Sequence, residues 1–260
     1  QQSDGTLWQP QNYDRKSHGK VPMYEALAKS YNQANVRLGM QVGVDKVLQQ
    51  LKKMGVDQFI PAYPSALLGA VEMSPLQVNQ VYQTIAGNGF YSPLSLVRQV
   101  TQANGQLLSH FPFAVRQAAS NDATYLLQHE MRMAAHYGTA KGVYQYLPKQ
   151  QQVSAKTGTT NDLKDSWFAG FSGQHVATVW LGREDAKPTP LTGAGGALHV
   201  WAQLMQHLAY TTYKDIKPQL IEYYHLNVKT GKAMPNNCPN GVWLPIPKVS
   251  APAFNKTCGY

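Results

Sequence analysis

The sequence predicts an α/β (α+β) fold in which helices sandwich an antiparallel sheet. Three observations support this fold class: helical patterns dominate the first half of the chain, three strand-like runs follow one another, and an amphipathic helix comes after them. Helices before and after a run of adjacent strands are typical of a sheet that is covered on both faces. Three strands make a thin sheet for two helical layers, so we expect the sheet to be incomplete in this chain.

The N-terminal part of the chain is expected to form a loop and then three helices. Residues 1–20 are polar and turn-rich, which is typical of an extended loop. A helix is predicted over Met23–Lys29, and Ser30-Tyr31-Asn32 ends it because serine and asparagine side chains compete for backbone hydrogen bonds. A second helix follows, and a third is predicted to have Asp45 as its N-cap and to stop at Gly55.

Two serines mark the starts of the longer helices in the middle of the chain. Ser74 is a candidate N-cap with Pro75 at the first helical position, and Ser120 is a candidate N-cap for a helix over about residues 122–136. Between these helices, Asn104-Gly105 separates two strand-like runs and predicts a β-hairpin.

The predicted sheet and the closing helix come next. Three neighbouring runs have strand-like composition: residues 152–160, 166–172 and 175–181. Gly193–Ala197 opens the closing helix, and beyond about residue 210 the periodicity fades into a Pro/Asn-rich tail. We therefore expect residues 1–210 to form one partial domain and residues 211–260 to form an extension of unknown role.

Composition restricts the class of partner. The formal charge is +9, from 23 basic and 14 acidic residues, which favours an anionic partner. The basic residues are scattered, without a Lys/Arg run or a basic helix with interleaved aromatics, so no nucleic acid is expected. No run of about 18 apolar residues indicates a transmembrane helix, and nothing in the sequence indicates a metal or a cofactor.

The two cysteines, Cys238 and Cys258, both lie in the tail. Their pairing would close a loop worth about 3 kcal/mol in an oxidising compartment, whereas in a reducing cytosol they would be free thiols. The cysteine count alone does not choose between the two.

The run Gln152–Thr160 holds the residues with the clearest chemistry. In an ideal strand, Lys156 and Gly158 share one face while Thr157 and Thr159 share the other. Gly158 allows a ligand or another backbone to lie close, and a cation with two hydroxyls suits a carboxylate. Taken alone, this run also fits an exposed edge strand whose lysine discourages aggregation.

A second motif lies far upstream. Ser30-Tyr31-Asn32 and Lys156-Thr157-Gly158 are two of three elements found in penicillin-recognising serine enzymes. The third is a serine three residues before a lysine, and it needs the first turn of a buried helix. The match in this chain, Ser17-His18-Gly19-Lys20, is rejected as the nucleophile because its surroundings read as a solvated loop.

Other catalytic patterns fail. His129-Glu130 begins a zinc-protease-like motif, but Met133 replaces the second histidine, so a helix surface pair is predicted. Gly170–Gly173 lacks the spacing of a nucleophile elbow. Four acidic residues near the strand ends are predicted to be solvated loop charges: Asp162, Asp165, Glu184 and Asp185.

With these two motifs in order, the chain resembles the C-terminal part of a class A penicillin-binding protein of the 1b type. The resemblance covers roughly residues 6–210, so the partial domain is identified as a β-lactamase/transpeptidase-like domain. The matching runs are Trp8–Asn12, the helix into Ser30-Tyr31-Asn32, Leu67–Ala70, Gln83–Ala86, Lys156–Asn161, Asp165–Gly170, Trp180–Arg183 and Gly193–Ala197.

The resemblance implies a D,D-transpeptidase that cross-links peptidoglycan stem peptides through a serine acyl-enzyme and is acylated by β-lactams. In that family the nucleophilic serine, its lysine and two sheet strands come before the position of Gln1. The family also implies an upstream glycosyltransferase domain that uses lipid II, an inner-membrane anchor and a periplasmic location. In that compartment a Cys238–Cys258 disulfide is expected. Members of this type are often regulated by outer-membrane lipoproteins, although no residue here identifies such a contact.

The resemblance also implies a role for each motif residue. Ser30 would relay the proton to the leaving amine, and Asn32 would bind the substrate amide and the lysine beside the nucleophile. Lys156 would supply positive potential for the terminal carboxylate, which the hydroxyls of Thr157 and Thr159 would bind at the Gly158 edge. The backbone N–H of Thr159 would form half of an oxyanion hole. Strand alternation separates Lys156 from the threonines, so a twist of the edge strand is expected to bring both to the ligand.

Two alternatives remain open at this level. A serine β-lactamase shares the Lys-Thr-Gly motif but needs a base that activates a deacylating water, and fast nitrocefin turnover would indicate it. A non-catalytic muropeptide-binding module would keep the fold without a nucleophile. The intact mass and N-terminal sequence of the purified protein separate this module from an enzyme.

Overall fold

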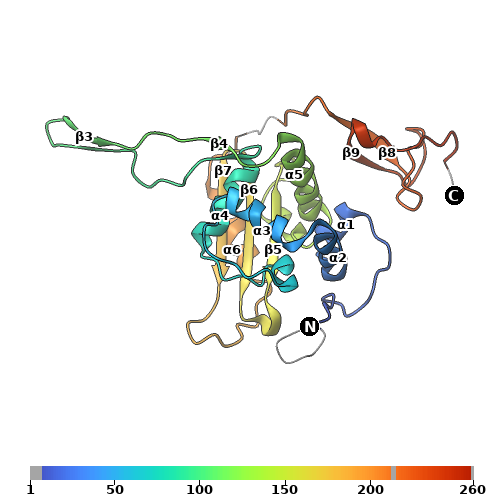
Figure 1. The fold of residues 1–260 in the computed structure, drawn as a ribbon, viewed down its shortest axis with the longest axis horizontal. Coiled ribbons are helices and arrows are strands. Elements are labelled where there is room, and N and C mark those ends of the chain that lie inside the picture. The colour runs from blue at the N-terminus through green and yellow to red at the C-terminus, as the bar shows by residue number, and fades with distance from the viewer. Residues whose placement is uncertain (1–7, 212–214, 259–260) are drawn as a thin grey trace.

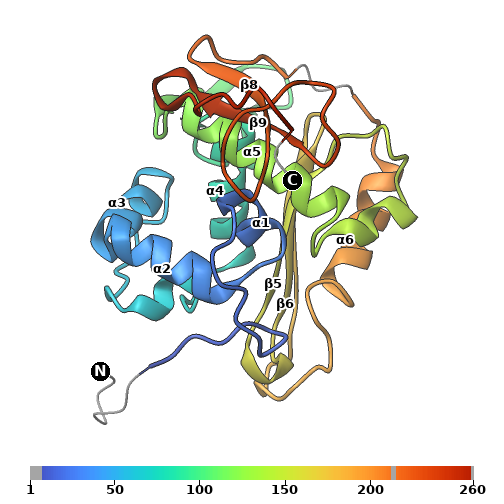
Figure 2. The same ribbon diagram turned by 90° about the vertical axis from the view of Figure 1, so that its right-hand side faces the viewer.

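A three-stranded antiparallel sheet lies between layers of helices in the computed structural model, which describes residues 8–211 and 215–258. The strands are β5 (Ser154–Thr159), β6 (Ser166–Ser172) and β7 (His175–Leu181), in the order β5-β6-β7. Figures 1 and 2 show α6 on one face of this sheet and α4 and α5 toward the other. The predicted sandwich and its three strands are confirmed.

The face of the sheet toward α6 (Ala197–His207) contains the larger core. Phe168 of β6 and Trp201 of α6 are both fully buried, with ring centroids 5.1 Å apart. The indole N–H of Trp201 donates to the Ala177 carbonyl of β7 at 3.0 Å, so the one polar atom of this ring is satisfied. This packing fixes α6 along the middle of the sheet.

Opposite side chains of the same strands face α5 (Asn121–His136) and α4 (Pro75–Ala86). Phe171 packs there with Met131 and Ile85. Since Phe168 and Phe171 are three residues apart on β6, strand alternation places them on opposite faces. The Ser154 hydroxyl donates to the Gln128 carbonyl of α5 at 3.1 Å, which joins the start of β5 to this helix.

The predicted N-caps of α4 and α5 are confirmed. Ser74 Oγ accepts the Gln77 backbone N–H at 3.2 Å, and the Gln77 side chain accepts the Ser74 backbone N–H at 2.8 Å, which completes a capping box. Ser120 Oγ accepts the Ala123 N–H at 3.2 Å.

Three short helices precede this core: α1 (Met23–Ala28), α2 (Asn32–Val42) and α3 (Val44–Lys53). The break between the first two at Ser30 is confirmed, but the predicted N-cap of the third is wrong. Gly43, with φ 101°, occupies the N-cap position, and Asp45 lies inside the first turn without a capping hydrogen bond. A carboxylate in the first turn still interacts favourably with the helix dipole. Asp45 therefore does mark the start of α3, but the N-cap lies two residues before it, at Gly43.

The predicted hairpin at Asn104-Gly105 is confirmed as β2 (Gln99–Thr101) and β3 (Leu107–His110). It projects from the body of the molecule in Figure 1. Two very short strands, β1 (Phe90–Tyr91) and β4 (Arg116–Gln117), pair at its base.

The tail contains structure that the sequence did not predict. Strands β8 (Ile221–Leu226) and β9 (Val242–Pro247) form an antiparallel pair, and a disulfide joins Cys238 to Cys258. Pro245 and Pro247 obscured the second strand because proline usually argues against a strand, whereas an edge strand tolerates it. Figure 2 shows this β8–β9 unit beside α5.

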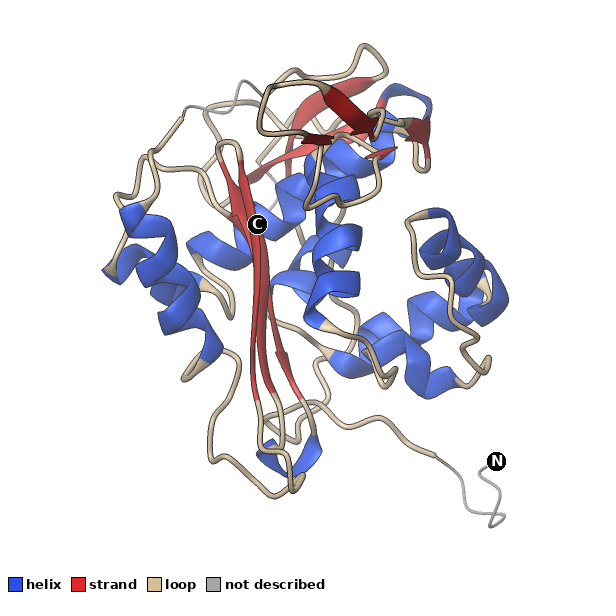
Figure 3. Cartoon of the chain, turned by 90° about the vertical axis from the view of Figure 1, so that its left-hand side faces the viewer, coloured by secondary structure: helices blue, strands red, loops and turns tan. Residues whose placement is uncertain are grey.

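No helix within the described residues is long and apolar enough to cross a bilayer. Figure 3 shows how the blue helices surround the red strands of the central sheet.

We expect Phe168→Ala to lower the free energy of unfolding by about 3–5 kcal/mol, because it leaves a cavity in the fully buried core. The matched control is Phe113→Ala, since Phe113 is 83% exposed and its loss should change stability by less than about 0.5 kcal/mol. Urea unfolding followed by circular dichroism measures both. Equal effects of the two substitutions would contradict this description of the core.

Candidate active site

A lysine on the sheet and a serine between two helices meet in the described structure. Lys156 Nζ of β5 donates to Ser30 Oγ at 2.8 Å and to the Thr157 carbonyl at 3.0 Å. β5 is an edge of the three-stranded sheet and pairs with β6 on one side. The two motifs separated in the sequence are therefore adjacent at an edge of the sheet.

Ser30 reaches Lys156 because the chain turns sharply after α1. The Ser30 N–H donates to the Leu27 carbonyl at 3.1 Å, and the Tyr31 N–H donates to the Ala26 carbonyl at 2.8 Å, as at a helix end. Ser30 itself has φ 59°, a left-handed conformation that is uncommon for a residue with a side chain. Such conformations concentrate at functional sites, where the surrounding structure maintains them.

The environment of Lys156 weakens its charge. The side chain is half-buried, and burial lowers the pKa of its ammonium group to about 8. A cation with this pKa is mostly protonated at neutral pH yet can lose its proton within the range in which an enzyme operates. The lysine can therefore supply positive potential and also take part in proton transfer.

The two threonines of the motif face the other side of β5. Thr157 Oγ1 lies 2.7 Å from Thr139 Oγ1, and Thr159 Oγ1 accepts the Gly193 N–H at 2.9 Å. The separation predicted from strand alternation is confirmed by these partners, because neither threonine shares one with Lys156. The Lys156 side chain and the two threonine hydroxyls therefore lie on opposite faces of β5, and a ligand can contact both only along the edge of the strand.

The glycine that allows a close backbone approach beside Gly158 is Gly193, in the loop before α6. A Cβ on Gly193 would lie 2.5 Å from the Gly158 carbonyl oxygen and 2.6 Å from that of Trp167. The loop before α6 therefore lies directly against β5, whereas a Cβ on Gly158 itself would lie 3.0 Å from the Trp167 Cβ of the neighbouring strand. Ser166, fully buried, holds the same loop by donating to the Thr192 carbonyl at 2.7 Å and accepting the Ala197 N–H at 2.9 Å.

Asn32 is not brought to Lys156 in this structure. It is the first residue of α2, and its Nδ2 donates to the Gln11 carbonyl at 2.7 Å. Ser17, at the rejected Ser-x-x-Lys match, is exposed in a loop, as predicted.

The prediction that Asp165 is a solvated loop charge is wrong. Asp165 is half-buried; it accepts hydrogen bonds from Thr160 Oγ1 and Trp180 Nε1, both at 2.9 Å, and its N–H donates to Thr160 Oγ1 at 2.8 Å. The aspartate therefore fastens the end of the site strand to β7. Its two partner residues lie 5 and 15 positions away in the sequence, so no local pattern signalled the role.

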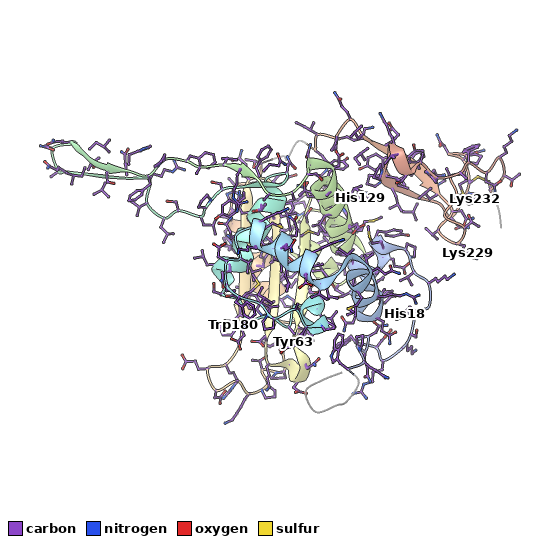
Figure 4. The ribbon with its side chains drawn as sticks, in the orientation of Figure 1. His18, Tyr63, His129, Trp180, Lys229 and Lys232 are labelled. Atoms are coloured by element: carbon purple, nitrogen blue, oxygen red, sulfur yellow. A yellow bond between two sulfur atoms is a disulfide. The ribbon has the colours of Figure 1, made fainter. Side chains whose placement is uncertain are left out.

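His129 and Glu130 are also misassigned by the sequence, which predicted a helix surface pair. Both are half-buried, and burial lowers the pKa of His129 to about 4 and raises the pKa of Glu130 to about 7. His129 lies on α5 (Figure 4), and its ring lies edge-on to that of Tyr223 of β8, with centroids 5.9 Å apart. The unpredicted β8–β9 unit lies over this part of α5, which explains the error.

An antiparallel sheet between helices, with a Ser-x-Asn turn facing a Lys-Thr-Gly strand, defines the β-lactamase/transpeptidase-like class of folds. The sequence profile described as "Penicillin binding protein transpeptidase domain" matches residues 1–197. The chain belongs to this family.

Relatives with known names agree with this assignment. The chain is 41% identical over 249 residues to penicillin-binding protein 1B of Vibrio cholerae, covering 94% of this chain and 31% of the relative. It is 37% identical over 223 residues to penicillin-binding protein 1B of Escherichia coli, covering 84% of this chain and 26% of that protein. The chain therefore spans at most about a third of these relatives.

Solved structures share the fold. Penicillin-binding protein 1A from Haemophilus influenzae superposes with a TM-score of 0.86 at 21% identity, over 97% of this chain and 44% of that one. The PonA1 protein from Mycobacterium tuberculosis, solved in complex with penicillin V, gives a TM-score of 0.68 at 23% identity, over 86% of this chain and 64% of that one. Penicillin-binding protein A of the same organism, an imipenem acyl-enzyme complex, gives 0.61 at 24% identity, over 77% and 52%.

Lys156 is expected to titrate near pH 8 in the folded protein, and near 10.4 when urea unfolds it. Between these values the unfolded chain binds more protons at Lys156 than the folded chain does. The free energy of unfolding therefore increases as pH rises from about 8 to about 10. The ¹³Cε chemical shift of Lys156 measures the midpoint, and Lys156→Met should remove this part of the pH dependence. A single midpoint shared by folded and unfolded protein would contradict the burial argument.

Gly193→Ala is expected to destabilise the protein by about 1–3 kcal/mol, because its Cβ would overlap two carbonyl oxygens of β5 and β6. Gly195→Ala is the control, since its Cβ would lie 3.1 Å from Thr192 Oγ1 alone. Thermal unfolding compares the two variants. A Gly193→Ala protein as stable as Gly195→Ala would show that the loop does not lie against the strand.

Proposed function

We propose that this chain is part of a D,D-transpeptidase domain that cross-links peptidoglycan stem peptides through a serine acyl-enzyme. The observation that carries the proposal is the 2.8 Å contact between Lys156 Nζ and Ser30 Oγ at an edge of the sheet. This contact connects the Ser30 hydroxyl, which can relay a proton, with the Lys156 ammonium group, which can lose a proton. β-Lactams are proposed to acylate the nucleophilic serine of this site, which is not Ser30.

The nucleophilic serine and its lysine are proposed to lie on a helix that precedes residue 1 in the full-length protein. Placed opposite Ser30, that lysine would take the proton of the nucleophile if it is neutral. The positive potential of Lys156 favours the neutral form, since a nearby like charge lowers the pKa of an amine. Asn32 is proposed to bind the substrate amide, which requires its side chain to exchange the Gln11 carbonyl for the ligand.

The threonine hydroxyls are suited to bind the terminal carboxylate. Thr159 Oγ1 accepts the Gly193 N–H, so its own proton remains available to donate to a ligand. In the Thr139–Thr157 pair either hydroxyl can donate; when Thr139 donates, the Thr157 proton is also available. The Thr159 N–H is proposed to form half of the oxyanion hole.

The proposed reaction has two acyl transfers. In the first, the serine oxygen bonds to the carbonyl carbon of the penultimate residue, the peptide C–N bond breaks, and the serine proton passes through Ser30 to the leaving amine of the terminal residue. In the second, an amine of another stem peptide bonds to the same carbon, the ester C–O bond breaks, and the amine proton returns to the serine oxygen.

We propose the remaining features of the whole protein from the family resemblance alone. These are an upstream glycosyltransferase domain acting on lipid II, an inner-membrane anchor, a periplasmic location and an outer-membrane lipoprotein activator. We also propose the division into residues 1–210, the transpeptidase part, and residues 211–260, a separate extension.

Fluorescent penicillin is expected to label the full-length protein covalently. Lys156→Ala should slow labelling about 10²–10³-fold by removing an electrostatic stabiliser, and Ser30→Ala should slow it about 10²–10⁴-fold by removing the proton relay. Ser17→Ala is the control and should label like the parent protein.

Labelled gel bands over time give these rates, and nitrocefin turnover is measured in parallel. Absence of any labelling in the full-length protein would sink the enzyme assignment, and rapid nitrocefin turnover would replace it with a β-lactamase.

A further inference from the structure

A cavity of about 550 Å³ lies beside the threonine face of β5. Its walls come from the end of α5, the 3₁₀ turn Lys141–Gln145 and the start of α6. Its principal lining residues are His136, Thr139, Lys141, Tyr144, Lys149 and Ala194. The volume is within the range of sites that bind small molecules or parts of larger ligands, about 300–1,000 Å³.

The charged groups of this cavity favour an anion. Lys141 and Lys149 line it, and no Asp or Glu is among its described lining residues. Neither lysine forms an ion pair with another described residue. Two lysines that line one hollow, with no carboxylate among its described lining residues, raise the local concentration of anionic ligand groups.

The cavity also has a rigid aromatic wall. The rings of His136 and Tyr144 stack with centroids 5.1 Å apart and an interplanar angle of 23°. The Tyr144 hydroxyl donates to the Gln151 carbonyl at 3.1 Å, which fixes the ring. A wall that is ordered before the ligand arrives reduces the entropy lost on binding.

The position of the cavity determines which part of the reaction it can serve. Thr139, in its wall, contacts Thr157 at 2.7 Å, and Ala194 follows Gly193, whose N–H is bonded to Thr159. The cavity is thus next to the two hydroxyls proposed to hold the carboxylate of the leaving residue. When that residue has left, the attacking amine must approach the acyl carbon from the space it vacated.

We infer that this cavity is the acceptor subsite of the transpeptidase, in which Lys141 and Lys149 bind a carboxylate of the peptide that supplies the amine. The inference rests on the proposed function. It adds that the enzyme favours an acceptor whose side chain carries a carboxylate, so that this amine competes better with water for the acyl-enzyme than an acceptor with an uncharged side chain of the same shape.

The test uses the full-length protein, a peptide ending in D-alanyl-D-alanine as acyl donor, and two acceptors, D-glutamate and D-glutamine. These acceptors differ only in a side-chain carboxylate or carboxamide. Mass spectrometry measures the ratio of aminolysis product to hydrolysis product for each acceptor. The parent protein is expected to favour D-glutamate by roughly threefold to tenfold, the effect of one or two partly screened ion pairs. This preference should shrink as ionic strength increases.

The double variant Lys141→Gln/Lys149→Gln should lose the preference for D-glutamate. The matched control Lys229→Gln/Lys232→Gln removes the same charge from exposed positions on the β8–β9 unit (Figure 4) and should keep it. A parent protein without preference, or a Lys141→Gln/Lys149→Gln variant that keeps it, overturns the inference. Fluorescent penicillin labels every variant in the same experiment. Labelling without acceptor preference refutes the subsite alone, whereas a parent protein that neither labels nor consumes the donor refutes the proposed function.

Discussion

The hydrogen bond between Lys156 and Ser30 joins residues 126 positions apart and connects the helical half of the molecule to the sheet. For this bond to form, α1 must end in a left-handed turn, and β5 must lie at an edge of the sheet with its lysine turned toward the helices. A half-buried ammonium group is tolerated there because Ser30 and a backbone carbonyl accept hydrogen bonds from it. The helical packing and the sheet order are thus both conditions for one short polar contact.

β5 divides the site between its two faces. The Lys156 side chain lies on the face toward Ser30 and α1. Thr157 and Thr159 lie on the opposite face, toward α6, where Thr139 and Gly193 orient them. Each threonine oxygen is positioned by a partner from a distant segment, which limits its rotation. The strand therefore separates the lysine proposed to take part in proton transfer from the hydroxyls proposed to bind the carboxylate by one residue, and a ligand along the edge is proposed to reach both.

The sequence was sufficient for features that depend on local chemistry. The capping serines, the Asn104-Gly105 turn and the alternation along β5 depend on neighbours within a few residues, and all were predicted. Long-range partners were not. Asp165 bonds to Trp180, fifteen residues away, and the burial of His129 depends on Tyr223, so no local pattern reveals either. The meeting of Ser30 with Lys156 followed from a family resemblance, not from the physical properties of either segment.

The hairpin formed by β2 and β3 projects as an arm whose stability does not depend on the sheet. Its strands pair with each other outside the body of the protein, and Leu107 and Leu108 are more than half exposed. A two-stranded hairpin in water is only marginally stable, so the arm opens independently of the domain that bears it. Its amides would exchange with solvent long before those of the sheet, and proteases would find their first cleavage point there. A fluorophore or an affinity tag inserted at the tip of this arm would therefore leave the candidate active site at β5 undisturbed.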